Sequence, residues 1–122
     1  MTKSEHEGQD MNSPGRVHPL YRAVPQLGRL RDDVLFGDVW EQAELSPRDR
    51  SLVTCAVLAS NGNGEELTNH LKRAVDNGVT VDELRGLVVQ VAFYAGWPAG
   101  LCAAKAGLEL FTESAGDTGD DN

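Results

Sequence analysis

Residues 65–74 read Glu-Glu-Leu-Thr-Asn-His-Leu-Lys-Arg-Ala, and this stretch predicts an amphipathic helix. Its apolar side chains recur at the three- and four-residue spacing of one helical face, namely Leu67, Leu71, Ala74 and Val75. His70 falls at the edge of this stripe, where a side chain is held by the core and can still meet a ligand. Glu66 precedes His70 by one helical turn, so the two side chains can touch. From this spacing, the pair is either a helix-stabilising contact at the surface or part of a functional site.

Helix start and stop signals lie on both sides of this segment. Ser46 suits an N-cap and Pro47 suits the first position of the helix that follows. Residues 80–83 read Thr-Val-Asp-Glu, which is a capping-box pattern. The chain pattern predicts helices over 25–35, 47–60, 64–77, 81–94 and 98–111, with a break at Gly37 and another turn through Trp40.

The expected fold class is all-α, a small helical bundle. Residues 47–60 are apolar on almost every side, so this helix is expected to be central and covered all round. Residues 87–94 could be a buried strand by propensity, but the cap before them and the length of the segment favour a helix. Helices that are apolar nearly all round are hard to hide in one small domain, which favours an oligomer over a monomer.

Length and charge limit the domain organisation and the classes of partner. The 122 residues suit one domain, which we expect over 19–111, between a disordered N-terminal segment over 1–18 and a disordered acidic tail over 112–122. The net charge of −8 and the lack of a basic cluster argue against nucleic-acid binding. No apolar run is long enough to span a bilayer, and the N-terminus lacks the apolar core of a signal peptide. A cytoplasmic location is therefore expected.

The available side chains favour acid–base chemistry. Cys55 and Cys102 lie in separate apolar stretches outside any CxxC motif, so buried free thiols are favoured over a disulfide. A metal site would need a distant third ligand beside Glu66 and His70, and no phosphate-binding loop is present. The remaining possibility is acid–base catalysis, with His70 as a proton carrier and a nearby arginine or lysine as the anchor for a small anionic ligand. No cofactor is expected.

Five segments resemble the carboxymuconolactone decarboxylase family of the alkylhydroperoxidase-like superfamily: Phe36–Trp40, Leu45–Thr54, Glu66–Ala74, Asn77–Thr80 and Tyr94–Ala99. The resemblance runs from about Leu35 to Leu110 and is closer to the 4-carboxymuconolactone decarboxylases than to the alkylhydroperoxidase branch. That branch carries a CxxC ending four residues before the histidine, and the two positions here are Asn63 and Glu66. It also uses a glutamate where this chain has Ser51. Peroxidase activity is therefore not expected.

The resemblance implies a bundle of the alkylhydroperoxidase-like type, a homotrimer or homohexamer, and a cofactor-free lyase. The reaction would convert 4-carboxymuconolactone to 3-oxoadipate enol-lactone and CO2 in protocatechuate breakdown. In this reaction His70 would return a proton, and Glu66 would orient its ring. The substrate carboxylates would be held by Arg73, Arg50 or Arg48, and the pocket would be lined by Tyr94 and Trp97. The arginines have an alternative role as solvated helix charges, and the two aromatic residues as core.

Two other functions fit the same pattern. One is a tailoring enzyme of secondary metabolism that acts on another unsaturated ring, because one helical frame can serve several substrates. The other is a non-catalytic oligomeric binding protein.

Overall fold

The computed structural model describes residues 18–118, with side chains through Ser114. The chain groups into two compact units, one ending at Ser46 and the other beginning at Pro47. Helices make up every element assigned in the described part, so the all-α prediction is confirmed, including a helix at residues 87–94. The predicted disorder of residues 1–17 and 119–122 concerns segments outside the described residues. Over 18–118 no helix is long and apolar enough to cross a membrane.

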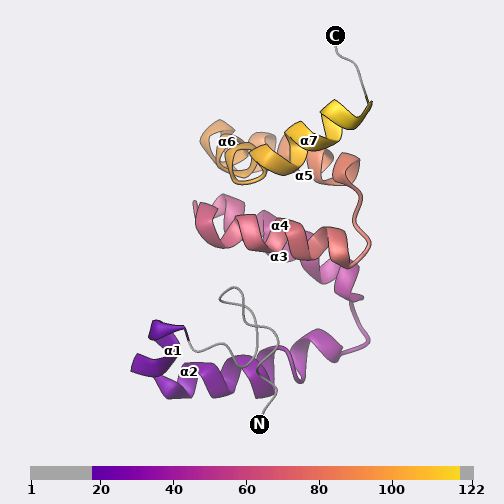
Figure 1. Cartoon of the computed structure of the whole chain (residues 1–122). Coiled ribbons are helices and arrows are strands. Elements are labelled where there is room, and N and C mark those ends of the chain that lie inside the picture. The colour runs from indigo at the N-terminus through magenta and orange to yellow at the C-terminus, as the bar shows by residue number, and fades with distance from the viewer. Residues whose placement is uncertain (1–17, 119–122) are drawn as a thin grey trace. The chain divides into compact units, whose positions relative to one another are not determined.

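The N-terminal unit consists of short helices, drawn in indigo to purple in Figure 1. They are α1 (Pro19–Ala23), α2 (Pro25–Arg29), the π-helix η1 (Leu30–Leu35) and the 3₁₀ turn η2 (Val39–Glu41). The helix predicted over 25–35 is confirmed as α2 continuing into η1, and the predicted turn through Trp40 is η2. Many of the aliphatic side chains of this unit are exposed, among them Leu20, Val24, Leu27, Leu30, Val34 and Leu35. Its buried side chain is instead that of Arg31.

The C-terminal unit contains α3 (Pro47–Ser60), α4 (Gly64–Asp76), α5 (Val81–Tyr94), α6 (Trp97–Ala106) and α7 (Leu108–Thr118). In Figure 1, α3 and α4 form one layer, and α5, α6 and α7 form a second layer against it. The predicted capping box begins α5, since Thr80 and Glu83 exchange side-chain to backbone hydrogen bonds. The core between the layers consists of Cys55, Ala59, Leu67, Leu71, Ala74, Val79, Leu84, Val91 and Ala103.

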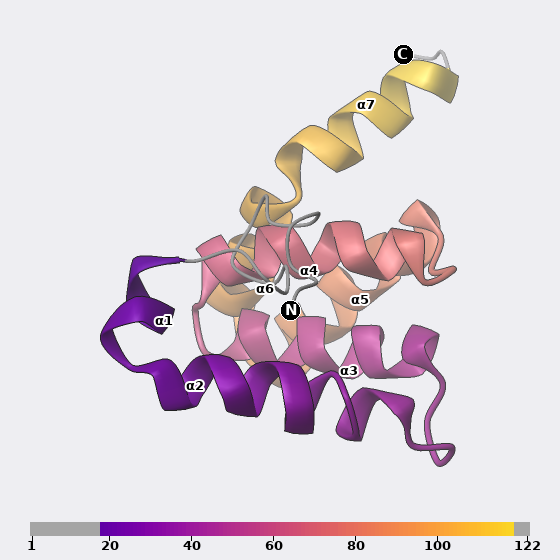
Figure 2. The same cartoon turned by 60° about the horizontal axis from the view of Figure 1, so that its bottom comes forward.

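The helix predicted over 98–111 is wrong, because the chain breaks at Gly107 into α6 and α7. The hydroxyl of Thr68 on α4 donates to the carbonyl oxygen of Ala106 at 2.9 Å, which engages a backbone acceptor at the end of α6. Gly107 is buried where a Cβ would lie 2.7 Å from Phe111 and 3.0 Å from Leu71. The tail predicted to be disordered from residue 112 is also corrected, since α7 continues to Thr118 and extends beyond the neighbouring helices in Figure 2.

The central helix α3 is not covered on all sides, which corrects the prediction. One face packs on α4, α5 and α6 through its buried residues Ser51, Cys55 and Ala59. The opposite face presents Val53 and Val57, each about half exposed. The five-helix unit therefore leaves an apolar surface that a buried helix was expected to hide.

Candidate functional site

Four polar residues follow one another along one side of α4 and its C-cap: Glu66, His70, Arg73 and Asn77. Their spacing of four, three and four residues keeps them on one helical face, and we call them the α4 polar row. The last member joins the row to α3, because the Asn77 side-chain amide donates to the Ser51 hydroxyl at 2.9 Å. Ser51 is fully buried. The row therefore runs along the α3 side of α4.

The other flank of α4 contacts α6 through the Thr68 hydroxyl. His70 thus lies between the apolar stripe and the α3 side, with a relative exposure of 9%. Glu66 and Arg73 are half-buried. These three residues, which the sequence predicted for the site, share one face of α4, and the imidazole is the least exposed of them, with a carboxylate and a guanidinium one turn away on either side.

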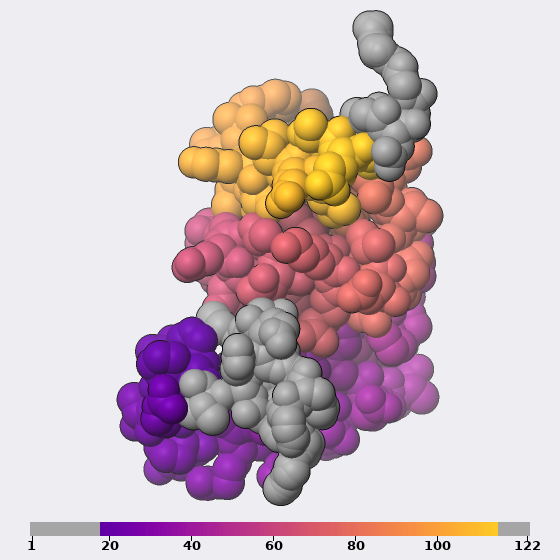
Figure 3. All heavy atoms as spheres, viewed as in Figure 1, coloured from indigo at the N-terminus to yellow at the C-terminus, as the bar shows by residue number. Residues whose placement is uncertain are grey.

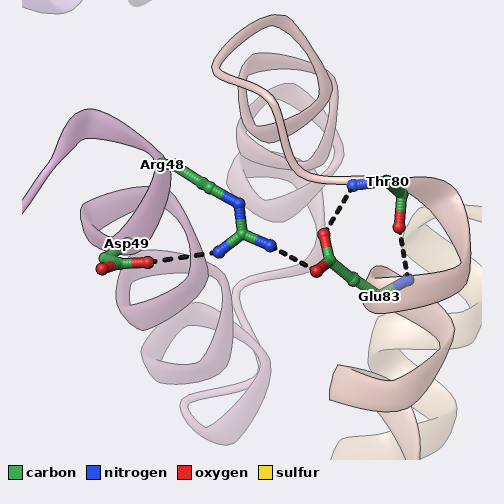
Figure 4. A network of polar contacts seen from close by, with 4 residues as sticks. All are labelled: Arg48, Asp49, Thr80 and Glu83. Atoms are coloured by element: carbon green, nitrogen blue, oxygen red, sulfur yellow. Dashed lines mark hydrogen bonds and ion pairs between the residues drawn. The ribbon is translucent and has the colours of Figure 1, made fainter.

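The other two predicted arginines lie near the start of α3. Arg50 is half-buried and precedes Ser51, so it lies at the Asn77 end of the α4 polar row. Arg48 is engaged in a different network, which Figure 4 shows. Its guanidinium pairs with the carboxylates of Glu83 and Asp49.

The Arg48 network stabilises the start of α5. Glu83 accepts a hydrogen bond from the Thr80 backbone N–H at 2.9 Å and pairs with Arg48, and both contacts lower the pKa of the Glu83 carboxyl. The hydrogen bond and charge of Glu83 raise the pKa of Arg48 in return. The geometry gives Arg48 the role of clamping the first turn of α3 to the capping box of α5 (Figure 4).

The aromatic residues predicted to line the pocket lie on the surface of this chain. Tyr94 ends α5 with a relative exposure of 84%, and Trp97 begins α6 with 60%. The Trp97 ring packs edge-on against Phe93, whose relative exposure is 74%, at 6.0 Å between centroids. These rings are exposed in the described chain, and neither Tyr94 nor Trp97 belongs to its buried core.

Two cavities adjoin α4, both on the flank away from the α4 polar row. One, of about 660 Å³, lies between α4 and α6 and includes Cys102 and Lys105 in its wall. The other cavity, of about 290 Å³, lies between α4 and α7. The atoms of these two helices form adjacent bands in Figure 3. The walls of these two cavities do not include His70.

A family model described as the carboxymuconolactone decarboxylase family matches residues 25–109. The chain belongs to this family. It is 42% identical over 78 residues to the 4-carboxymuconolactone decarboxylase of Acinetobacter baylyi, covering 64% of this chain and 58% of that protein. It is 36% identical over 63 residues to the nitrosuccinic acid decarboxylase npaB of Metarhizium robertsii, covering 52% of this chain and 44% of that protein. The chain thus spans about half the length of these curated relatives.

Asn63 is the N-cap of α4, and Glu66 lies in the first turn of this helix. The two cysteines are free, as predicted, but only Cys55 is fully buried. Burial raises the pKa of the Cys55 thiol to about 12, which keeps it protonated at neutral pH.

Ser51 and Asn77 are the residues of this site that sequence reasoning missed as functional partners. Both occur in segments that carry the family resemblance, and Asn77 follows His70 by seven residues, which places it on the same helical face. That spacing could have identified Asn77. Ser51 could not be identified in this way, because its contact with Asn77 arises from the packing of α3 against α4.

Proposed function

We propose that the protein is a cofactor-free decarboxylase, converting 4-carboxymuconolactone to 3-oxoadipate enol-lactone and CO2 in protocatechuate catabolism. The observation that carries the proposal is the α4 polar row, in which a buried imidazole has a carboxylate and a guanidinium as neighbours on one helical face. Membership of the family supports the reaction class, and both curated relatives carry the word decarboxylase in their names.

The chemistry requires that the electrons of the breaking carbon–carbon bond enter the conjugated lactone carbonyl and that a proton return to carbon. His70 supplies this proton, a role worth about 10²–10⁴-fold in rate for a well-placed acid. Glu66, one turn before it, orients the ring and stabilises its charged form. The small exposure of His70 keeps bulk water from competing for the intermediate.

Arg73 is proposed to bind the carboxylate that stays on the substrate. A cation on the departing carboxylate would stabilise the ground state more than the transition state, because that carboxylate loses its charge as CO2 forms. Arg73 lies one turn beyond His70 on the same side of α4, so it can hold a second carboxylate while the proton is delivered. Arg50, at the Asn77 end of the row, is the further candidate.

A second substrate class is an alternative to 4-carboxymuconolactone. Similarity to nitrosuccinic acid decarboxylase npaB favours, as a second candidate, the decarboxylation of another carboxylated substrate by a tailoring enzyme of secondary metabolism. The same three side chains serve either reaction, since each needs charge stabilisation and proton return. Separate turnover assays with 4-carboxymuconolactone and with nitrosuccinate distinguish the two candidates.

We also propose that the chain forms a helical bundle of the alkylhydroperoxidase-like type and that it assembles as a homotrimer or homohexamer. The apolar surface of the C-terminal unit supports association, since Val57 on α3 and Phe93, Trp97 and Leu101 near the α5–α6 junction are each more than half exposed. A second copy covering these side chains would remove them from water. Light scattering of the purified chain gives the stoichiometry, and a monomer at micromolar concentration contradicts this part.

The reaction is tested by incubating the purified full chain with 4-carboxymuconolactone and measuring the CO2 that is released. His70→Asn is expected to lower kcat by about 10²–10⁴-fold, the contribution of a lost general acid. Arg73→Met is expected to raise KM, because it removes a carboxylate anchor. Lys72→Ala is the matched control, since Lys72 is an exposed cation on the same helix outside the row.

Undiminished kcat in His70→Asn removes His70 from the mechanism. Absence of turnover by the wild-type chain, with CO2 released from nitrosuccinate, assigns the protein to the second candidate. If neither compound reacts and small carboxylates bind without being consumed, the non-catalytic binding function expected as an alternative is correct.

A further inference from the structure

In the N-terminal unit a charged side chain takes the buried position. Arg31 on η1 has a relative exposure of 7%, whereas its neighbour Leu30 has 54% and Leu27 has 49%. Arginine is almost never buried to this degree unless it is paired, because removing its charge from water is costly. The contacts of Arg31 should therefore account for its burial.

Two aromatic rings flank the Arg31 guanidinium. Its Cζ lies 5.7 Å from the centroid of Tyr21 on α1 and 5.1 Å from that of Phe36, which caps η1. Both distances fall within the range of cation–π attraction, about 6 Å. The Phe36 backbone N–H donates to the Arg31 carbonyl at 2.9 Å, the five-residue bond of a π-helix, an element frequent at functional sites.

The hydrogen bonds of the same guanidinium are incomplete. Nη1 of Arg31 donates to Oδ1 of Asp32 at 2.9 Å. Nη2 is buried and has no hydrogen-bond partner among the described residues. Aromatic faces stabilise the charge but give the in-plane N–H groups no acceptor, so a buried, charged donor is left over.

We infer that Arg31 forms a carboxylate-binding site in the N-terminal unit, which takes one carboxylate of a small, planar organic acid through Nη2. The guanidinium fork matches an oxygen acceptor of this geometry. The rings of Tyr21 and Phe36 suit a planar ligand body beside it. Asp32 already neutralises part of the charge, so a single carboxylate fits better than a dianion such as phosphate.

The Arg31 site is argued from side chains of the N-terminal unit and from none of the α4 polar row, and its binding step involves no reaction. It can therefore be tested by binding alone. A chain that does not decarboxylate the proposed substrates does not contradict the Arg31 site. A chain that does not bind a carboxylate at Arg31 does not contradict the proposed role of His70.

The test is a titration of the ¹⁵N-labelled full chain with benzoate, and with benzamide as a neutral ligand of the same shape. Benzoate is expected to shift the amide resonances of residues 30–36 saturably, and benzamide is not. Arg31→Met is expected to weaken benzoate binding at least tenfold, on the order of a lost charged hydrogen bond. Arg29→Met, an exposed arginine two residues away, is the matched control and should bind as the wild type does.

Equal benzoate binding in Arg31→Met overturns the inference, as do equal shifts with benzamide. Shifts confined to residues 66–77 also overturn it, because they assign the anion to the α4 polar row. If circular dichroism shows that Arg31→Met does not fold, the wild-type titration and Arg31→Lys decide. The lysine variant keeps the charge but loses the fork, so it should bind benzoate more weakly. Absence of a saturable shift at residues 30–36 in the wild type overturns the inference by itself.

Discussion

Two glycines in neighbouring helices should respond differently to the same substitution. Gly100 on α6 is buried, and a Cβ built on it would lie 2.5 Å from the Cβ of Ala92 and 3.0 Å from its Cα on α5. Gly86 on α5 is exposed, and a Cβ there would meet nothing within 4 Å. Each glycine lies inside a helix, so alanine brings the same gain in helix propensity at both, about 0.8–1.0 kcal/mol.

The difference between the two variants isolates the packing of α5 on α6. Carbon atoms pack at about 3.5–4.0 Å, so Gly100→Ala must push the helices apart by about 1 Å. Such overpacking costs about 1–3 kcal/mol. Gly86→Ala should therefore stabilise the protein by up to about 1 kcal/mol, while Gly100→Ala should be less stable than Gly86→Ala by about 1–3 kcal/mol.

Urea unfolding followed by circular dichroism, at one fixed protein concentration, measures both free energies of unfolding. Adding Ala92→Gly to Gly100→Ala removes the nearest atom of the clash, and a coupling free energy of about 0.5–3 kcal/mol is expected in the double-mutant cycle. If Gly100→Ala is as stable as Gly86→Ala, the close approach of α5 and α6 is refuted.

Three further predictions address other contacts. Because its neighbours lower the folded-state pKa of Glu83, this carboxylate stabilises the fold above its unfolded pKa of about 4.3, and the stabilisation is lost as pH falls through the folded pKa. The difference in Tm between the wild type and Glu83→Gln should thus be largest near neutral pH and shrink on acidification, and a constant difference contradicts this. Asn77→Ala removes the hydrogen bond between α4 and α3 and should lower the free energy of unfolding by about 1 kcal/mol in urea; an unchanged value argues that the bond contributes nothing. A thiol reagent should label native Cys102 first, and Cys55 only on unfolding, because Cys55 is fully buried with a raised pKa. Rapid labelling that persists in Cys102→Ser would contradict this order.

Helices with strong local signals could be predicted from the sequence. Pro47 and the Thr80–Glu83 capping box predicted the first residues of α3 and α5, because caps and N-terminal prolines act within one turn of chain. Residues 64–76 formed the predicted amphipathic helix, since its 3.6-residue period shows in any isolated stretch. That periodicity also placed Glu66, His70 and Arg73 on one helical face. Each of these features depends on residues at most a few positions apart.

Tertiary structure alone decided which side chains are covered and which are not. At the break at Gly107, the Thr68 hydroxyl of another helix donates to the last carbonyl of α6, a contact that the small residues around the break did not reveal. Likewise Arg48 is taken up by Glu83, which lies 35 positions further along the chain, and nothing in the sequence near Arg48 distinguishes this clamp from a substrate anchor.

The burial of Arg31 among exposed leucines is the strongest departure from the sequence pattern. Periodicity measures where apolar side chains could face, but burial is set by which elements pack together. The α4 polar row shows both levels at once. Its spacing follows from the sequence, whereas its position beside the buried Ser51 follows from the antiparallel packing of α4 on α3, through contacts that no local pattern encodes.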